Sequence, residues 1–322
     1  MRAGEDFFNL YNHELIRVAV AVPAVRVADP AFNARQVVDL IAQAAERRAV
    51  VVLFPELCLS AYSCEDLFHQ GALLEACRGA LSNVLEASRH LSIVAVVGMP
   101  LVVDQLLYNC AVVVCRGQVL GVVPKTYLPG YREFYEPRQF ASGDAAGPDR
   151  IECGGQRDVP FGSDLLFQLE EQPLATFHVE ICEDLWVPTP PSSEAALAGA
   201  TVLLNCSASN VTVAKADYRH LLVASQSARC LAAYLYSGAG YGESTTDLAW
   251  DGHALIYENG GLLAESRRFS YEPQLTCAEI DLERLAQERM RQTSFAQAAE
   301  RHRDRLRRFR RVRTPLGLPR RG

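Results

Sequence analysis

Three residues with reactive side chains each follow an apolar run that is typical of a buried strand. Glu56 follows "VVVLFP", Lys125 follows "VLGVVP" and Cys182 follows "FHVEI". Ligand sites in α/β sheets lie beyond strand ends, so three such residues could meet in one site. A cysteine can attack an electrophilic carbon, a carboxylate can take the thiol proton and return it to a leaving group, and an ammonium can favour the thiolate. The pattern favours nucleophilic chemistry on a small molecule.

The immediate surroundings of Cys182 are acidic. Glu180 precedes it, and Glu183 and Asp184 follow it, in "HVEICEDLW". Negative neighbours disfavour a thiolate, so a reactive Cys182 needs a cation from elsewhere in the chain, for which Lys125 is the candidate. Each residue also has a structural alternative: an inert core thiol, a capping carboxylate or a surface lysine of a hairpin. Spacing alone does not show that the three converge.

Other catalytic chemistries lack their residues. The chain has no G-x-S-x-G, H-E-x-x-H or G-x-x-x-x-G-K-[ST] motif, and its seven histidines do not cluster at ligand spacing, so no metal site is expected. A cysteine site assisted by His178 or His220 stays open as an alternative. The glycine-rich segment "SGAGYGESTTD", residues 237–247, is a weak candidate for a phosphate loop because it lacks the Lys-Ser/Thr ending.

The composition is that of a soluble globular protein. The chain has 322 residues, of which 49% are hydrophobic and 22% charged, with a formal net charge of -6. This balance gives no overall attraction to nucleic acid or to an acidic membrane, and the apolar runs are too short to span a bilayer. Ten cysteines without C-x-x-C spacing indicate reduced thiols that mostly fill the core, so we expect a cytoplasmic protein.

Strand and helix patterns alternate along the chain. Strands are expected at residues 17–25, 49–55, 93–100, 173–181, 201–206 and 234–239, and helices at residues 33–48, 71–90, 192–199 and 215–233. Hairpins are expected to turn at Arg116-Gly117 and at Asn259-Gly260. The segment between Phe140 and Phe161 is rich in Gly, Asp and Pro, which predicts a long surface connection. The order indicates a mixed sheet covered by helices.

The last 22 residues, "RHRDRLRRFRRVRTPLGLPRRG", are strongly basic. We expect a solvated helix end that is mobile from Arg301 onward and that runs into a linker at residues 313–322. A nucleic-acid-binding arm is the less favoured alternative, because only Phe309 could stack on a base.

The residues around the three reactive groups resemble the nitrilase superfamily of carbon-nitrogen hydrolases. The resemblance is carried by "FPELCLSAY", "VPKTYLPGYREFYEPRQF" and "EICEDLW". It places the catalytic Glu, Lys and Cys of that superfamily on Glu56, Lys125 and Cys182. It places the superfamily's second glutamate, which positions the lysine or the substrate amide, on Glu133.

A more specific resemblance extends from residue 17 to residue 312. With "NCSASN" and "GYGESTTDLAWDGHALIYENG", the chain is similar to the glutaminase domain of glutamine-dependent NAD+ synthetases. The resemblance implies one domain over residues 1–312, a four-layer αββα sandwich, and hydrolysis of the L-glutamine side-chain amide through a Cys182 thioester, without a metal or organic cofactor. We also expect a homo-oligomer that binds neither nucleic acid nor membrane. The resemblance assigns glutamine recognition to Tyr131, Phe134, Glu183 and Ser209, with Glu183 holding the α-ammonium.

The same resemblance raises the question of where the released ammonia goes. Enzymes of that kind continue into a synthetase domain that uses ATP and Mg, with an S-G-G-x-D-S type loop, and these 322 residues contain no such loop. We therefore expect either a separated or truncated glutaminase half or a stand-alone protein that retains this half, with a synthetase domain or subunit as the ammonia acceptor. Two alternatives stay open: an amidase acting on another small amide, and a non-catalytic partner of a synthetase subunit. Ala61 and His178 stand where the family often has glycine.

Overall fold

Two β-sheets form the centre of the protein. The computed structural model describes residues 9–145 and 147–318. In spatial order, the first sheet consists of β14 (Gln274–Asp281), β1 (Leu15–Val22), β2 (Val51–Leu53), β3 (Val94–Val103), β4 (Leu106–Cys115) and β5 (Gln118–Pro124). The second sheet consists of β13 (Gly261–Glu265), β12 (Ala254–Glu258), β11 (Ala233–Gly238), β10 (Val202–Ser207), β9 (Thr176–Ile181), β8 (Leu165–Leu169) and β15 (Arg310–Thr314).

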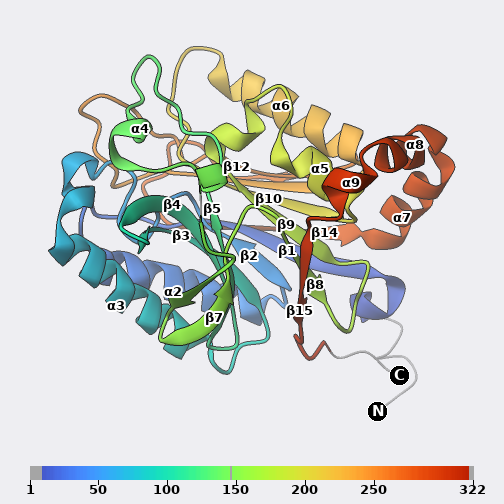
Figure 1. The fold of residues 1–322 in the computed structure, drawn as a ribbon, viewed down its shortest axis with the longest axis horizontal. Helices are drawn as coiled ribbons and strands as arrows, with labels where there is room; N and C mark the ends of the chain where they lie inside the picture. Colours follow the sequence, from blue (N-terminus) through green and yellow to red (C-terminus); the bar gives the residue numbers. More distant parts are fainter. Residues whose placement is uncertain (1–8, 146, 319–322) are drawn as a thin grey trace.

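Helices cover the outer face of each sheet. The α-helices are α2 (Pro30–Glu46), α3 (Gly71–Ser88), α4 (Glu136–Gln139), α5 (Pro191–Leu197), α6 (Lys215–Cys230), α7 (Leu282–Arg291), α8 (Thr293–Arg301) and α9 (Arg303–Leu306). The 3-10 helices are η1 (Leu10–His13), η2 (Glu65–His69), η3 (Gly143–Ala145) and η4 (Cys182–Leu185). Helices α2 and α3 lie against the first sheet, and α5 and α6 lie against the second (Figure 1).

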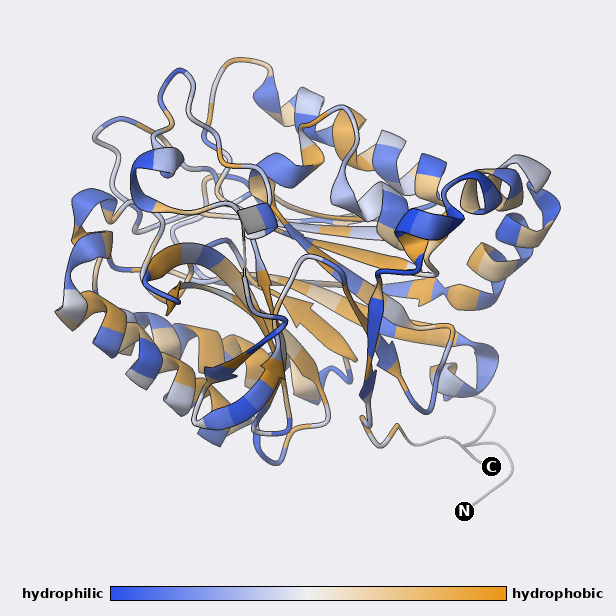
Figure 2. Cartoon of the chain, in the orientation of Figure 1, coloured by the Kyte–Doolittle hydropathy of each residue, from blue (hydrophilic) through white to orange (hydrophobic). Residues whose placement is uncertain are grey.

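The strand period of two divides the apolar side chains between the layers. In β1, Val18 and Val20 pack into the core between the two sheets, whereas Ala19 and Ala21 pack toward α2 and α3. The strands are accordingly apolar in the interior, while polar residues occupy the outer faces of the helices (Figure 2). The arrangement is the αββα sandwich that the sequence resemblance implies.

Helix α2 shows how the sequence fixes one of these layers. The Asp29 carboxylate caps the helix by accepting a hydrogen bond from the backbone N–H of Phe32 at 3.0 Å, and Pro30 occupies the first turn. The buried residues then follow the helical period: Val37, Leu40, Ile41 and Ala44. None of the helices in the described parts of the chain is both long and apolar enough to cross a membrane.

The direction of the strands determines where their ends meet. In the first sheet β2 and β3 are parallel, and β5 runs the same way because it follows two antiparallel pairings from β3 through β4. In the second sheet β9, β10 and β11 are parallel. The backbone N–H of Glu56, just beyond β2, donates to the carbonyl of Ser207 at the end of β10 at 3.3 Å. The ends of β2 and β10 therefore meet across the two sheets.

Two expectations about connections are wrong. The segment between Phe140 and Phe161 is not only a surface connection, because it contains the antiparallel hairpin of β6 (Arg150–Cys153) and β7 (Gln156–Pro160). Its turn is Gly154-Gly155, and both glycines have positive φ, +59° and +72°, a conformation that glycine adopts without strain.

The basic tail is also part of the fold. Strand β15 pairs in parallel with β8 from Arg310 opposite Leu165 to Thr314 opposite Leu169, and Leu316 is fully buried in the core between the sheets. The boundary expected after residue 312 therefore falls inside a strand. The segment from Arg301 to Thr314 forms helix and strand instead of a mobile linker; residues 319–322 lie outside the described residues.

Candidate active site

The ends of β2 and β5 bring Glu56 and Lys125 into direct contact. The Lys125 ammonium lies 2.6 Å from Glu56 Oε1 and 2.6 Å from Glu136 Oε1, and the Lys125 and Glu56 side chains are fully buried. Asn109 on β4 donates to the same Glu56 oxygen at 2.6 Å. Gly98 on β3 allows this packing, since a Cβ there would lie 2.2 Å from the backbone nitrogen of Leu57.

The second glutamate at the lysine is Glu136, not Glu133. Glu136 begins the short helix α4, which directs its carboxylate inward, where it also accepts a hydrogen bond from the Tyr62 hydroxyl at 2.8 Å. Glu133 lies three residues earlier in the loop and accepts a hydrogen bond from Asn210 Nδ2 at 2.5 Å. The structure therefore transfers the expected positioning of Lys125 from Glu133 to Glu136.

Cys182 lies on a sharp turn between β9 and η4. Its φ of +44° is in the left-handed region that residues with a side chain rarely adopt, which places the thiol at a strained elbow. Its backbone N–H donates to Asn205 Oδ1 at 3.2 Å, and its Sγ lies 3.3 Å from the hydroxyl of Ser207 on β10.

Asp184 ties this elbow to the segment after the lysine. Its carboxylate accepts the backbone N–H of Ile181 at 2.9 Å and the backbone N–H of Tyr127 at 2.8 Å. Burial raises the pKa of Asp184 to about 8, although both hydrogen bonds act in the opposite direction. One of the acids next to Cys182 in the sequence therefore has a structural role. Asp184 connects the turn at Cys182 to the segment that follows Lys125.

Burial sets the protonation of the reactive groups. It raises the pKa of the Cys182 thiol, the Glu56 charge raises it further, and the opposing effect of Lys125 does not offset them. Burial alone would lower the pKa of Lys125, but the carboxylates of Glu136 and Glu56 hold it well above its usual range. Both shifts favour a neutral thiol and a protonated ammonium, so a nearby base must take the thiol proton before or during an attack by Cys182.

A cavity of about 530 Å³ opens above Cys182. All four residues to which the resemblance assigned glutamine recognition line it, together with Glu133 and a lysine that the sequence reading missed: Tyr131, Phe134, Glu183, Ser209 and Lys215. Lys215 begins α6, and its charge at the start of a helix was the only sequence signal that set it apart.

The cavity wall carries charges of both signs. The Tyr131 hydroxyl donates to Glu183 Oε1 at 2.9 Å, and burial raises the pKa of Glu183. The Lys215 ammonium lies 5.6 Å from the ring centre of Phe134 and 5.2 Å from that of Trp186, and burial lowers its pKa. A carboxylate and an ammonium on one wall suit a zwitterionic ligand.

Three other features of the sequence have structural explanations. His178 is fully buried with its Nδ1 3.2 Å from the carbonyl of Leu165, and His220 bonds the Tyr257 hydroxyl, so the structure gives neither imidazole a hydrogen bond to Cys182. Ala61, which stands where the family often has glycine, has φ of +71°.

The glycine-rich segment of residues 237–247 does not resemble a phosphate cradle in three dimensions. Its Glu243 carboxylate is buried and accepts the backbone N–H groups of Tyr62 at 2.8 Å and Ser63 at 3.0 Å. A buried carboxylate in this loop would repel a phosphate.

One cluster in the described residues could supply metal ligands: His220, His253 and Glu265. The two imidazoles lie 3.3 and 2.8 Å from the same Glu265 oxygen. However, Arg219 faces His253 Nδ1 at 3.2 Å, so this nitrogen must accept a hydrogen bond and Nε2 must carry the proton. A metal-binding imidazole normally donates from its second nitrogen, so the cluster fits a proton network better than a metal.

The comparisons with known proteins agree with this geometry. Residues 17–290 match the carbon-nitrogen hydrolase family. The chain is 50% identical over 315 residues to the glutamine-dependent NAD(+) synthetase of Mycobacterium tuberculosis, a match that covers 98% of this chain and 46% of the relative. The corresponding synthetase of Mycobacterium leprae is 49% identical over 314 residues, with the same coverage. The chain thus spans about half the length of these curated relatives.

Solved structures show the same fold. A glutamine-dependent NAD(+) synthetase from Cytophaga hutchinsonii superposes with a TM-score of 0.74 at 28% identity, covering 83% of this chain and 43% of that one. An amidase of the nitrilase superfamily from Nesterenkonia AN1 has a TM-score of 0.65 at 21% identity, covering 91% of this chain and 97% of that one. The chain belongs to the carbon-nitrogen hydrolase family.

Proposed function

We propose that this hydrolase cleaves the side-chain amide of L-glutamine, with Cys182 as the nucleophile. The observation that supports it best is the shape and charge of the cavity. Cys182 lines the cavity, and a buried cluster of Glu56, Lys125 and Glu136 acts on its pKa. A carboxylate and an ammonium stand on the wall above it. Glutamine has a carboxamide at one end and a zwitterionic α-carbon at the other.

The proposed reaction uses Cys182, the backbone N–H of Glu183 and the buried cluster of Glu56, Lys125 and Glu136, which we call the floor. As Cys182 Sγ attacks the carboxamide carbon, Glu56 takes the thiol proton, and Lys125 and the backbone N–H of Glu183 stabilise the oxyanion. Glu56 then returns the proton to the departing nitrogen, which leaves as ammonia from a γ-glutamyl thioester. A water molecule gives a proton to Glu56 and attacks the thioester, which releases glutamate and restores the thiol. No step uses a metal or an organic cofactor.

The wall residues supply the selectivity. Glu183, supported by Tyr131, is placed to hold the α-ammonium, and Lys215 with Ser209 is placed to hold the α-carboxylate. Phe134 lines the same cavity and contributes an apolar side. Glu133 also lines the cavity, where it is placed to contact the substrate amide.

The names of the relatives suggest how the ammonia is used. The mycobacterial relatives are glutamine-dependent NAD(+) synthetases, and this chain matches 46% of their length. We infer that the ammonia released here is consumed by an ATP-dependent synthetase domain or subunit that converts deamido-NAD to NAD. These 322 residues, incubated with glutamine, ATP, magnesium and deamido-NAD, should release glutamate and ammonia at a low rate without forming NAD. Formation of NAD by this chain alone would overturn the inference.

The substrate is tested with a panel of amides. The purified chain should release ammonia from L-glutamine and much less from glutaramate, which lacks the α-amino group, or butyramide, which lacks both α-groups. Cys182→Ala should abolish turnover, by roughly 10³-fold or more. Its matched control is Cys230→Ala, a buried thiol at the end of α6 that does not line the cavity, which should keep its activity. Equal activity on butyramide would instead indicate a general amidase, and no hydrolysis of any amide would indicate a non-catalytic partner.

A further inference from the structure

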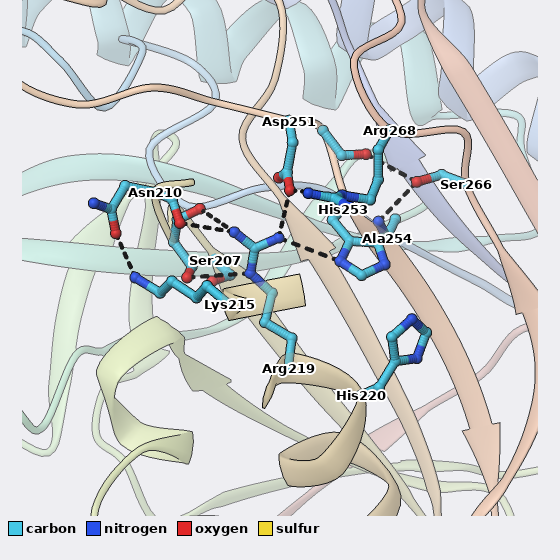
Figure 3. A network of polar contacts seen from close by, with 12 residues as sticks. Ser207, Asn210, Lys215, Arg219, His220, Asp251, His253, Ala254, Ser266 and Arg268 are labelled. Carbon is cyan, nitrogen blue, oxygen red and sulfur yellow. Dashed lines mark hydrogen bonds and ion pairs between the residues drawn. The ribbon is translucent and has the colours of Figure 1, made fainter. Parts of the chain in front are cut away.

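Arg219, on α6, is a fully buried arginine whose guanidinium has all of its donors engaged. Nη2 donates to the backbone carbonyls of Ser209 at 3.0 Å and Asn210 at 2.8 Å, and Nε donates to Ser209 Oγ at 3.3 Å. Nη1 donates to Asp251 Oδ2 at 2.7 Å and to His253 Nδ1 at 3.2 Å. Figure 3 shows this guanidinium between the Asn210 corner and Asp251. Arg219 is not among the residues that line the cavity above Cys182.

Arg219 holds the backbone at Ser209 and Asn210, and these two residues contact or form part of the cavity wall. The Asn210 side chain accepts a hydrogen bond from the Lys215 ammonium and donates to Glu133 Oε1 at 2.5 Å. Ser209, Lys215 and Glu133 all line the cavity. A displacement of the Ser209-Asn210 backbone would therefore move three of the cavity's polar groups together.

The other side of the guanidinium is anchored by charge. Asp251 is buried and also accepts a hydrogen bond from Arg268 Nε at 3.0 Å. This contact holds the Asp251 carboxylate in place against Arg219. The buried pair and its hydrogen bonds leave no side-chain atom of Arg219 or Asp251 buried without a partner. A guanidinium with all five donors engaged has few alternative geometries, so it can hold the backbone of Ser209 and Asn210 in one position.

We propose that Arg219 is a positioning residue that sets the recognition of the α-amino acid end of the substrate. The proposal rests on the proposed glutaminase function. Arg219 makes no hydrogen bond to Glu56, Lys125 or Cys182, so its replacement alters substrate binding and leaves the reactivity of the thiol in place. A residue that merely held the fold together would change both.

The test compares the buried Arg219 with the partly buried Arg289, because both donate to backbone carbonyls. Arg219→Lys keeps the charge beside Asp251, but a compact ammonium cannot reach two carbonyls, a hydroxyl and a carboxylate at once. The matched control is Arg289→Lys. Arg289 on α7 also donates to three backbone carbonyls, of Ala200 at 2.5 Å, Cys230 at 3.0 Å and Leu231 at 3.0 Å, but none of these residues lines the cavity.

Two readouts separate binding from chemistry. One is KM and kcat for L-glutamine; the other is the rate at which iodoacetamide alkylates Cys182, followed by mass spectrometry. In Arg219→Lys we expect KM to rise by ~tenfold or more. Alkylation of Cys182 should stay within about twofold of the wild-type rate, because this reagent lacks the α-groups that the wall recognises. Arg289→Lys should leave both KM and the alkylation rate unchanged.

The outcomes are distinct. If wild-type protein does not hydrolyse glutamine, the proposed function fails and this proposal fails with it. If wild-type protein hydrolyses glutamine and Arg219→Lys keeps its KM, or loses alkylation in proportion to turnover, the positioning role alone is overturned. Should Arg219→Lys not fold, Asn210→Ala answers the same question, since it keeps the buried pair and cuts the links to Lys215 and Glu133. It should raise KM without slowing alkylation, and an unchanged KM would refute the proposal.

Discussion

Two buried ion clusters, one of Glu56, Lys125 and Glu136 and one of Arg219 and Asp251, differ in how completely their buried side-chain atoms are hydrogen-bonded. At the floor, Lys125 bonds one oxygen each of Glu56 and Glu136, and the second carboxylate oxygen of both glutamates is buried without a partner. In the second cluster, which lies behind the cavity wall formed by Ser209 and Lys215, no buried side-chain nitrogen or oxygen of Arg219 or Asp251 lacks a hydrogen-bond partner.

The difference separates chemistry from support. A buried acceptor without a partner costs ~1–3 kcal/mol, so it persists where a proton or a substrate group will meet it. The two free oxygens at the floor are suited to receive the thiol proton and to contact the reacting amide. The five N–H donors of the Arg219 guanidinium are all engaged, two of them with backbone carbonyls, so the guanidinium has no donor left for a ligand. The comparison predicts that substitutions in the cluster around Lys125 lower kcat, whereas substitutions in the cluster around Arg219 weaken substrate binding and lower the stability of the fold.

Among changes to the two ion clusters, the largest effect should come from Lys125→Arg. The ammonium fits between two carboxylates at 2.6 Å in a site without solvent access, and a planar guanidinium is too wide for this space. We expect kcat to fall by roughly 10²–10³-fold, as when an oxyanion donor is lost. Circular dichroism serves as the folding control. Near wild-type turnover would show that the floor cluster is not tightly built.

A second prediction compares the two glutamates of the lysine loop. Glu136→Gln removes one of the two carboxylates that position Lys125, so kcat should fall by ~10²-fold. Glu133→Gln keeps a side chain of the same shape at the wall, so it should act mainly on KM. Steady-state kinetics on glutamine distinguish the two. The opposite pattern would restore the lysine-positioning role to Glu133.

Behind the wall, Asp251→Asn should reduce stability more than catalysis. The substitution leaves the buried Arg219 charge uncompensated, which typically costs about 3–5 kcal/mol of unfolding free energy. The folded fraction should keep a kcat close to that of the wild type. Urea titration and kinetics at a temperature where the variant is folded measure the two effects. A variant of normal stability with a strongly reduced kcat would place Asp251 in the chemistry.

The smallest effect concerns pH. Burial raises the pKa of Glu136 from 4.5 to about 7, against the opposing charge of Lys125. The folded protein therefore binds a proton that the unfolded chain lacks between these two pH values, so this contribution to stability is present below pH 4.5 and is lost as the pH rises toward 7. Unfolding free energies measured across this range should decline more steeply for the wild type than for Glu136→Gln. Parallel curves would contradict the raised pKa.

The sequence was sufficient for the parts of the fold that follow a regular period. The apolar runs that precede Glu56, Lys125 and Cys182 are strands β2, β5 and β9. Within the first sheet β2 and β5 run in the same direction, and in the second sheet β9 is parallel to β10, whose end meets that of β2. The resemblance supplied the αββα layers. The turns at Arg116-Gly117 and Asn259-Gly260 are where the glycines required them.

Features that follow no regular sequence period could not be predicted from the sequence. Glu133 lies in a loop whose residues have no repeating orientation, and Glu136 is the first residue of the four-residue helix α4, so no sequence period shows which of them faces Lys125. The hairpin of β6 and β7 is mostly polar, and its only clear signal was Gly154-Gly155. Arg219 looks like any other charged residue of an amphipathic helix, because burial is a property of the assembled molecule.

Strand β15 carries a further consequence. It occupies the edge of the second sheet beside β8, whose sequence Leu165–Leu169 is mostly apolar, and three of its own five residues are arginines: Arg310, Arg311 and Arg313. A row of arginines along an exposed edge discourages another strand from pairing with it. A chain shortened before Arg310, as if the basic segment were a dispensable linker, would uncover the apolar edge of β8. Such a chain would tend to aggregate through that edge, so the arginines help to keep neighbouring molecules apart.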